Sequence, residues 1–154
     1  MIISAEESLK LIDKDRSNKH RIVFTNGCFD ILHIGHARYL ADAKTLGDRL
    51  VVGINSDKST RELKGLDRPV NCELDRAELL LSLKSVDYVI IFDELDPVRL
   101  IKEVKPDFLV KGGDWSIDQI LGGDFVMSYG GKVLSLPFIQ GRSTTNIINK
   151  IRAI

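Results

Sequence analysis

The chain has 154 residues, a length that fits one domain with a full hydrophobic core, and we expect that domain to cover residues 1–154. Its 22 basic and 22 acidic residues give a formal net charge of zero, which argues against a general attraction to nucleic acid or to an acidic membrane surface. The N-terminus lacks the pattern of a signal peptide and no apolar run is long enough to span a bilayer, so we expect a cytoplasmic protein. The two cysteines, Cys28 and Cys72, do not have the spacing of a disulfide framework. We therefore expect free thiols, which are typical of the reducing cytosol.

Segments with helix and strand patterns alternate along the chain. The first is a helix, predicted from the capping-box pair Ser4 and Glu7 and expected to end near Asp13. The later segments are, in order, a strand at 21–25, a helix at 37–46, a strand at 49–55, a helix at 73–83, a strand at 88–92, a helix from 96–97 to about 104, a strand at 108–111, a short helix capped by Ser116, a strand at 132–136 and a last helix capped by Ser143. Glycine pairs such as Gly122-Gly123 are expected in the turns. This order predicts an α/β fold: a Rossmann-like, doubly wound five-stranded parallel sheet with helices on both faces.

The turn between the first strand and the helix that follows it carries the strongest functional signal. It runs from Thr25 to His36 and places His33 and His36 three residues apart, where both imidazoles can project to one side and donate N–H groups to phosphate oxygens. The start of a helix favours an anion, and Gly35 lets the main chain come close to it. A zinc site is the alternative, but it needs about three or four protein ligands. Because no third histidine and no paired cysteines lie within motif distance, we expect no protein-bound metal.

The carboxyl ends of the strands are where a parallel sheet gathers its ligand sites. Thr25, Asn55, Lys111 and Phe138 all lie at or just after such ends. A dinucleotide-dependent dehydrogenase would share this architecture, but it needs Gly-x-Gly-x-x-Gly after its first strand. Residues 26–31 instead read Asn-Gly-Cys-Phe-Asp-Ile, which argues against that class of enzyme.

Two motifs connect the chain with a known superfamily. The tetrapeptide His33-Ile34-Gly35-His36 and residues 141–148, Gly-Arg-Ser-Thr-Thr-Asn-Ile-Ile, resemble the nucleotidyltransferases marked by His-x-Gly-His, as does the order of elements. Class I aminoacyl-tRNA synthetases share the first motif, but 154 residues leave no room for their other catalytic signature and anticodon-binding parts. Further segments are similar to the adenylyltransferase half of the bifunctional heptose kinase/adenylyltransferases: Asn55-Ser56-Asp57, Leu63-Lys64-Gly65, Arg68-Pro69-Val70-Asn71 and Leu109 to Trp115.

This resemblance implies an enzyme that transfers AMP from ATP to D-glycero-β-D-manno-heptose 1-phosphate. The products would be pyrophosphate and the ADP-heptose that is used for the inner core of bacterial lipopolysaccharide. Because the kinase half is missing from this sequence, the resemblance implies a free-standing adenylyltransferase, and it also implies a homo-oligomer, either a dimer or a tetramer. Magnesium is expected to travel with ATP, held by phosphates and waters rather than by a protein cage.

Two alternatives stay open. One is a cytidylyltransferase for a small phosphorylated alcohol such as glycerol 3-phosphate, whose family carries an Arg-Thr pair that helps to read cytosine. This chain has Phe138-Ile139 at those positions, which argues against CTP and leaves open how adenine is read. The other alternative is a catalytically silent nucleotide-binding module, against which the intact His33, His36, Lys64 and Ser143 speak.

The expected site residues fall into three groups. The catalytic group supplies donors and cations to the phosphates, with Lys64 on a charged loop that swings over them: Thr25, His33, His36 and Lys64. The nucleotide-binding group follows the first turn, the end of the fourth strand and the cap of the last helix: Thr25, Asn26, Gly27, Phe29, Gly35, His36, Lys111, Gly141, Arg142, Ser143, Thr144 and Thr145. The substrate-binding group meets the sugar phosphate and comes mainly from the resemblance: Asp30, Asp57, Lys64, Arg68, Arg76, Asp114 and Trp115. Arg142, which replaces the family's usual isoleucine, either contacts phosphate or faces solvent.

Overall fold

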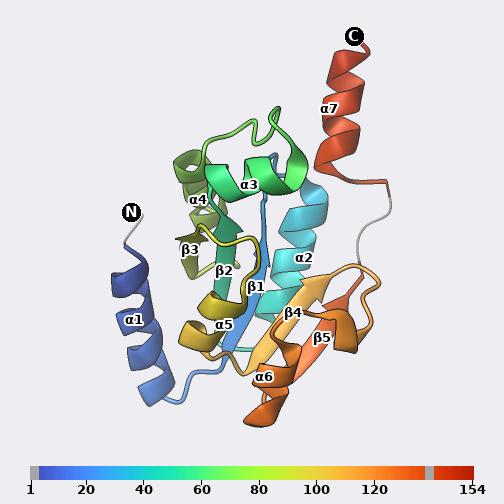
Figure 1. Cartoon of the computed structure of the whole chain (residues 1–154). Helices are drawn as coiled ribbons and strands as arrows, with labels where there is room; N and C mark the ends of the chain where they lie inside the picture. Colours follow the sequence, from blue (N-terminus) through green and yellow to red (C-terminus); the bar gives the residue numbers. More distant parts are fainter. Residues whose placement is uncertain (1–3, 138–140) are drawn as a thin grey trace.

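Five parallel strands form the centre of the molecule. The computed structural model describes residues 4–137 and 141–154, and the strands lie in the order β3-β2-β1-β4-β5 (Figure 1). Their bounds are Ile22–Gly27 for β1, Arg49–Asn55 for β2, Tyr88–Phe92 for β3, Phe108–Gly112 for β4 and Lys132–Leu136 for β5. Every neighbouring pair is parallel, which confirms the doubly wound α/β fold predicted from the alternation of elements.

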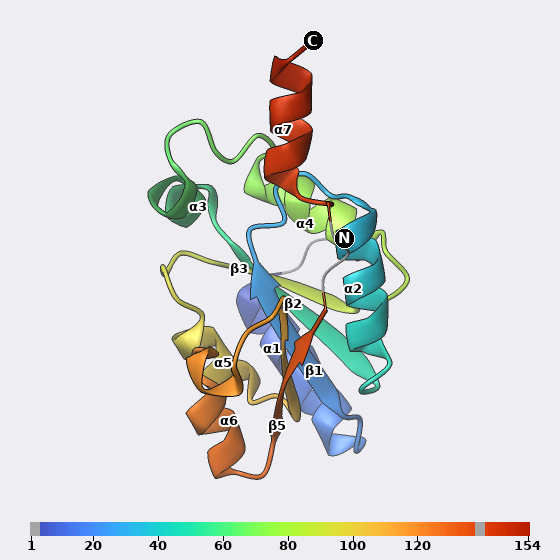
Figure 2. The same ribbon diagram turned by 90° about the vertical axis from the view of Figure 1, so that its right-hand side faces the viewer.

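Helices cover both faces of the sheet (Figure 2). One face carries α2 (Ile34–Lys44) and α4 (Glu73–Leu81), and the other carries α1 (Ala5–Ser17), α5 (Val98–Val104) and α6 (Gly123–Ser128). The helices α3 (Asp57–Lys64) and α7 (Thr144–Arg152) lie beyond the carboxyl ends of the strands, and a 3₁₀ turn, η1 (Ile117–Gln119), precedes α6. Among the helices so described, none is long and apolar enough to cross a bilayer.

Two hydrophobic cores result from the alternation of side chains along buried strands. In β1, Phe24 packs into the core under α1, α5 and α6, whereas Val23 packs into the core under α2 and α4. In β2, Val51 and Val52 divide in the same way. Because successive strand residues point to opposite faces, a continuous apolar run is what a strand covered on both sides requires.

The winding of the chain reverses between β1 and β4, which are neighbours in the sheet although far apart in sequence. The connections between β1, β2 and β3 carry helices on one face, and those from β3 through β4 to β5 carry helices on the other. At such a reversal the loops after the two strands diverge and leave a crevice at the carboxyl ends. The fold therefore places the residues after β1 opposite those after β4.

Several helices differ from the sequence predictions. Helix α2 begins at Ile34 rather than at Ala37, so Gly35 and His36 belong to its first turn. The capping box at Ser4 and Glu7 is present, but α1 continues to Ser17 rather than ending near Asp13, because Asp15 is buried and bonded to the sheet. Helix α3 lies where the strongly charged sequence predicts a loop. It forms after Ser56, whose hydroxyl accepts a hydrogen bond from the Ser59 amide at 3.2 Å.

The glycine pair 122–123 is only partly a turn. Gly122 has a positive φ of 82°, as a turn requires, but Gly123 is the first residue of α6, a helix that the sequence pattern did not predict. The predicted capped helix at Ser116 is a single 3₁₀ turn. Both elements are short, and short helices give too few residues for a periodic pattern to be recognised.

Asp15 joins α1 to the amino-terminal edge of the sheet. Its carboxylate accepts hydrogen bonds from the Tyr88 hydroxyl at 2.6 Å, Arg49 Nε at 2.9 Å and His20 Nδ1 at 2.8 Å. Burial alone would raise the pKa of Asp15, but these three donors outweigh it and lower the pKa to about 2. The ionised carboxylate is therefore one of the groups that stabilise the folded state.

Replacing Asp15 with asparagine is expected to lower the free energy of unfolding by about 2 kcal/mol at pH 7, the equivalent of its pKa shift from 3.8. Because the folded-state pKa is depressed, this contribution is fully present above about pH 4 and is lost as pH falls towards 2. Urea unfolding of both proteins between pH 2 and pH 7 measures the difference in their free energies of unfolding. This difference should become smaller as the pH falls. Asp13→Asn, at a side chain that is 70% exposed, is the control and should change stability by less than about 1 kcal/mol.

Candidate active site

A cavity of about 500 Å³ opens at the reversal between β1 and β4. Its walls come from the β1–α2 turn, the ends of β2 and β4, the end of α3 and the start of α7. The predicted site residues among its lining are Asn26, Gly27, Phe29, Asp30, His36, Lys64, Arg68, Lys111, Trp115, Thr144 and Thr145. Residues far apart in sequence thus meet at one cavity.

His33 and His36 stack on each other at the start of α2. Their ring centroids are 3.8 Å apart and their planes differ by 19°. His36 lines the cavity, whereas His33, the N-cap residue of α2, is not among the lining residues. In both residues Nδ1 is buried and has no hydrogen-bond partner among the described residues. A buried polar atom without a hydrogen-bond partner is unusual in a folded protein, and a catalytic role is one explanation for it.

Burial favours the neutral form of both imidazoles. Burial, followed by the neighbouring His33, lowers the pKa of His36 to about 4. Burial, followed by the positive charge of Arg142, also lowers the pKa of His33. A neutral imidazole offers one N–H donor, and a nearby anion would raise both pKa values by favouring the charged form.

Phe29 shapes the wall beside the histidines. It has a φ of 48°, a left-handed conformation that is uncommon for a bulky residue, and its ring centroid lies 5.1 Å from that of His36. The ring also covers Gly27, where an added Cβ would come within 3.1 Å of it. Backbone conformations of this kind cost energy and concentrate at binding sites.

Gly35 makes room for an imidazole. A Cβ at this position would lie 2.8 Å from Nδ1 of His33 and 3.4 Å from Cβ of Arg142. The sequence argument assigned the glycine to the close approach of the main chain to a phosphate. The geometry adds a second reason, because only glycine lets the His33 ring lie flat over the start of α2.

Replacing Gly35 with alanine is expected to displace the His33 ring and lower kcat about 10–100-fold, because small misplacements of reacting groups have effects of this size. Stability should not fall, since alanine is favoured over glycine in a helix by about 0.5–1 kcal/mol. Steady-state kinetics and thermal unfolding measure the two effects. Ile34→Ala, at the neighbouring exposed position of α2, should leave kcat unchanged. Full activity of Gly35→Ala would contradict the steric role.

The amino-terminal end of α7 closes another side of the cavity. The Ser143 hydroxyl accepts a hydrogen bond from the Asn146 amide at 3.0 Å, so the predicted cap is present, although Ser143 itself does not line the cavity. The Thr144 hydroxyl donates to the Ile31 carbonyl at 3.1 Å and ties α7 to the β1–α2 turn. The rest of α7 buries no residue and projects from the body of the molecule (Figures 1 and 2).

Cations dominate the electrostatics of the cavity. Burial, and then the nearby Lys64, lower the pKa of Lys111, although Cys28 acts in the opposite direction. Asp30 is the one carboxylate among the described lining residues. It forms an ion pair with Arg68 and accepts hydrogen bonds from the Val70 and Asn71 amides at 2.8 and 3.0 Å. Lys64 is the last residue of α3 and does not lie on a loop, because a helix forms where the sequence predicts a loop.

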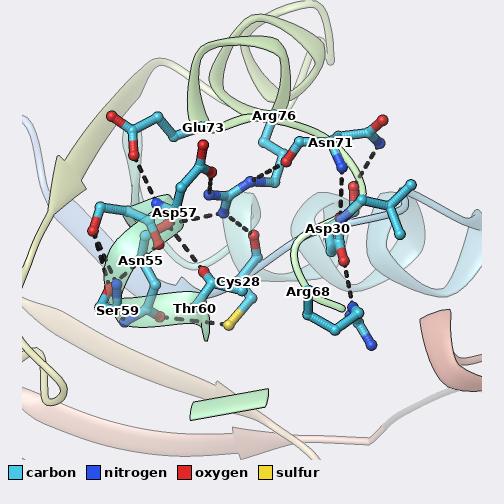
Figure 3. A network of polar contacts seen from close by, with 12 residues as sticks. Cys28, Asp30, Asn55, Asp57, Ser59, Thr60, Arg68, Asn71, Glu73 and Arg76 are labelled. Carbon is cyan, nitrogen blue, oxygen red and sulfur yellow. Dashed lines mark hydrogen bonds and ion pairs between the residues drawn. The ribbon is translucent and has the colours of Figure 1, made fainter. Parts of the chain in front are cut away.

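Arg76 is a buried support rather than a surface cation. Its exposed fraction is 0%, and it donates to the carbonyls of Cys28 at 2.6 Å, Asn55 at 2.8 Å and Asn71 at 3.0 Å and to the Asp57 carboxylate at 2.8 Å (Figure 3). This placement corrects the expectation that Arg76 and Asp57 bind substrate. Neither residue lines the cavity, and together they fix the loops that do.

Thr25 also needs a correction. Its side chain is fully buried, and its hydroxyl lies 2.6 Å from the Tyr39 hydroxyl, behind the cavity rather than on its surface. We therefore assign Thr25 to the support of the turn. Five other expected residues lie outside the lining: His33, Gly35, Asp114, Gly141 and Arg142. Phe138 and Ile139 lie outside the described residues.

The expected site groups left out part of the lining, although the sequence had placed Asn55 at a strand end: Cys28, Tyr39, Asn55, Leu63, Leu95, Pro97, Gly112 and Leu121. Asn55 and Gly112 end β2 and β4, so their position at a strand end was a usable signal. The apolar members carry no chemical signature, and only the tertiary structure brings them here. No described residues form a cluster of three or more histidine, cysteine or acidic side chains suited to a metal ion.

The chain is similar to curated bacterial proteins over nearly its whole length. The chain is 55% identical over 151 residues to the bifunctional protein HldE of Campylobacter fetus subsp. fetus and 52% identical over 142 residues to HldE of Geotalea uraniireducens. These matches cover 98% and 92% of the chain but only 31% and 29% of those proteins.

Among solved structures, a lipopolysaccharide core biosynthesis protein from Thermoplasma volcanium is 33% identical with a TM-score of 0.65, and the match covers 80% of this chain and 99% of that one. Pantothenate synthetase from Thermus thermophilus shares the fold at 14% identity, with a TM-score of 0.62 and coverage of 96% and 67%. The family model described as cytidylyltransferase-like matches residues 24–150. The chain, in which His36 and the start of α7 line one cavity, belongs to this cytidylyltransferase-like family.

Proposed function

We propose that the chain is an adenylyltransferase that transfers AMP from ATP to D-glycero-β-D-manno-heptose 1-phosphate, giving ADP-heptose and pyrophosphate for the inner core of lipopolysaccharide. The observation that carries the proposal is that His36, Lys111 and the start of α7 line one cavity. Similarity to HldE over nearly the whole chain supports the choice of reaction, and the chain spans about three tenths of those relatives.

The chemistry needs positioning and charge neutralisation more than a covalent catalyst. An oxygen of the sugar phosphate attacks the α-phosphorus of ATP, the bond to the β-phosphate oxygen breaks, and its electron pair leaves with pyrophosphate. Because the attacking oxygen belongs to an ionised phosphate, no proton has to be removed. His33 and His36 donate hydrogen bonds as charge builds on the phosphates, and Lys64 and Lys111 supply positive charge.

The start of α7 suits the far end of the triphosphate. Thr144 and Thr145 line the cavity, and the first amides of a helix are unpaired donors that favour an anion. Magnesium enters with ATP, since the lining offers cations and one already bonded carboxylate, Asp30, rather than a carboxylate cage. The proposed protein works in the cytoplasm as a homo-oligomer, a dimer or tetramer, which light scattering after gel filtration would measure.

Pyrophosphate release tests the reaction. The purified chain is offered ATP or CTP together with heptose 1-phosphate of either anomer, with glycerol 3-phosphate, or with no acceptor. We expect release only with ATP and the β-anomer. Release with CTP and glycerol 3-phosphate would instead favour the cytidylyltransferase alternative, which the description of the matching family keeps in view. ATP binding without turnover of any acceptor would favour a silent nucleotide-binding module.

A further inference from the structure

A second cavity of about 170 Å³ adjoins the first. Asn26, Pro97, Lys111, Trp115 and Leu121 line both cavities, so the smaller one is a side chamber of the larger. Gln119 and Ile120 line only the smaller one, which we call the side cavity. The two spaces therefore meet at the ends of β1 and β4, next to the Lys111 ammonium.

The side cavity and the histidines belong to opposite faces of the sheet. Pro97 precedes α5, and residues 115–121 connect β4 to α6, and both of these helices cover the same face. His36 lies in α2, which covers the other face. Suppose that a triphosphate runs between the start of α2 and the start of α7. The side cavity would then lie on the opposite side of the strand ends from this triphosphate.

The geometry of in-line displacement indicates which of the two substrates the side cavity suits. The attacking oxygen and the leaving pyrophosphate lie on opposite sides of the α-phosphorus, whereas the nucleoside is attached to neither of those positions. With the leaving group at His36 and α7, the acceptor approaches from the side of Lys111 and the side cavity. The nucleoside then lies to one side of this line.

We propose that the side cavity binds the sugar of the acceptor and that Gln119 is a specificity-determining residue that reads its hydroxyl groups. This inference rests on the proposed adenylyltransferase function and adds the subsite to it. The Gln119 amide has both donor and acceptor atoms, as neighbouring sugar hydroxyls require. Lys111, at the junction of the two cavities, meets the phosphate of the same acceptor.

The remaining lining fits an uncharged sugar ring. The Trp115 indole is held by a hydrogen bond from Nε1 to the Gly112 carbonyl at 3.1 Å, and the Trp115 amide donates to the Ser135 hydroxyl at 3.2 Å. Pro97, Ile120 and Leu121 add apolar surface, and the described lining of the side cavity includes no carboxylate. A few polar groups on an apolar wall are typical of small-molecule sites.

Two substitutions at Gln119 test the subsite. Gln119→Ala removes the amide and is expected to raise KM for heptose 1-phosphate about three- to tenfold, the effect of losing one neutral hydrogen bond. Gln119→Trp fills the cavity and should raise that KM further. The Kd for ATP, measured by calorimetry, should stay unchanged in both variants. Because Gln119 is exposed in a short 3₁₀ turn, both proteins should fold.

Asp118→Asn is the matched control, since Asp118 is exposed in the same turn and lines neither cavity. It should leave KM and the Kd for ATP as they are. Normal wild-type turnover with an unchanged KM in both Gln119 variants would overturn the subsite alone. Weaker ATP binding with an unchanged KM for heptose 1-phosphate would place the nucleoside in the side cavity. That result would also overturn the proposed sugar subsite. Absence of wild-type turnover would instead overturn the proposed function, and the inference with it.

Discussion

Replacing His36 with alanine is expected to lower kcat about 10²–10³-fold, the usual effect of removing one donor that follows charge in the transition state. His36 lines the cavity, and its Nδ1 is buried without a partner among the residues described, so its removal costs the ring contacts with His33 and Phe29 but no hydrogen bond of that nitrogen. Stability should therefore change little. Pyrophosphate release and thermal unfolding of the same preparation separate the two effects.

His20→Ala is the matched control for this variant. His20 bonds to Asp15 at the amino-terminal edge of the sheet, away from the cavity, so its loss should lower stability without changing turnover by the folded protein. Turnover of His36→Ala at the wild-type rate would falsify the donor role. A loss of turnover that only parallels unfolding would also contradict it.

The pH dependence of ATP binding is a second test of the proposal that His36 contacts the phosphates. With a pKa of about 4, His36 is neutral in the free protein at pH 7. A bound triphosphate raises that pKa, so the complex takes up protons and ATP should bind more tightly as pH falls from 7 towards 5. Calorimetry in buffers of different ionisation enthalpy measures this uptake. The variant His36→Ala should take up fewer protons, and equal uptake by both proteins would contradict the assignment.

Arg76→Met is expected to lower the free energy of unfolding by about 3–5 kcal/mol, because it leaves the buried partners of a fully buried cation unpaired. The Cys28 and Asn55 carbonyls would lose their donor, and Asp57 would lose its ion pair (Figure 3). Urea unfolding measures the loss. Arg76→Lys keeps the charge without the planar fork and should recover only part of the stability.

Arg99→Met is the control for Arg76. Arg99 is 53% exposed and pairs with Glu94 and Glu103 on the surface, where such pairs contribute about 0–1 kcal/mol. Arg99 has two acidic partners and Arg76 has one, so burial rather than the number of ion pairs is expected to make the loss of Arg76 the larger one. Equal effects of the two substitutions would contradict the supporting role of Arg76.

The sequence by itself determined the strands of the sheet, and it predicted the residues at the two ends of the proposed phosphate site. The predicted bounds of β2, β3 and β5 match the observed ones. For the inner strand β2 the signal is a nearly continuous apolar run, which a strand covered on both faces requires. The spacing of His33 and His36 and the cap at Ser143 are local features, since they depend on residues within one helical turn. Their chemistry could be predicted without knowledge of distant contacts.

Only the tertiary structure decided which charged residues face the cavity. Arg68 and Arg76 look alike in sequence, yet Arg68 lines the cavity and Arg76 is fully buried. Partners far away in the chain make this difference, because Asp30 holds the first, and the Cys28 and Asn55 carbonyls hold the second. The apolar wall at Leu95 and Leu121 likewise arises where loops meet at the reversal of the sheet. Whether a side chain is buried depends on how the whole chain packs, so it cannot be predicted from the chemistry of that side chain alone.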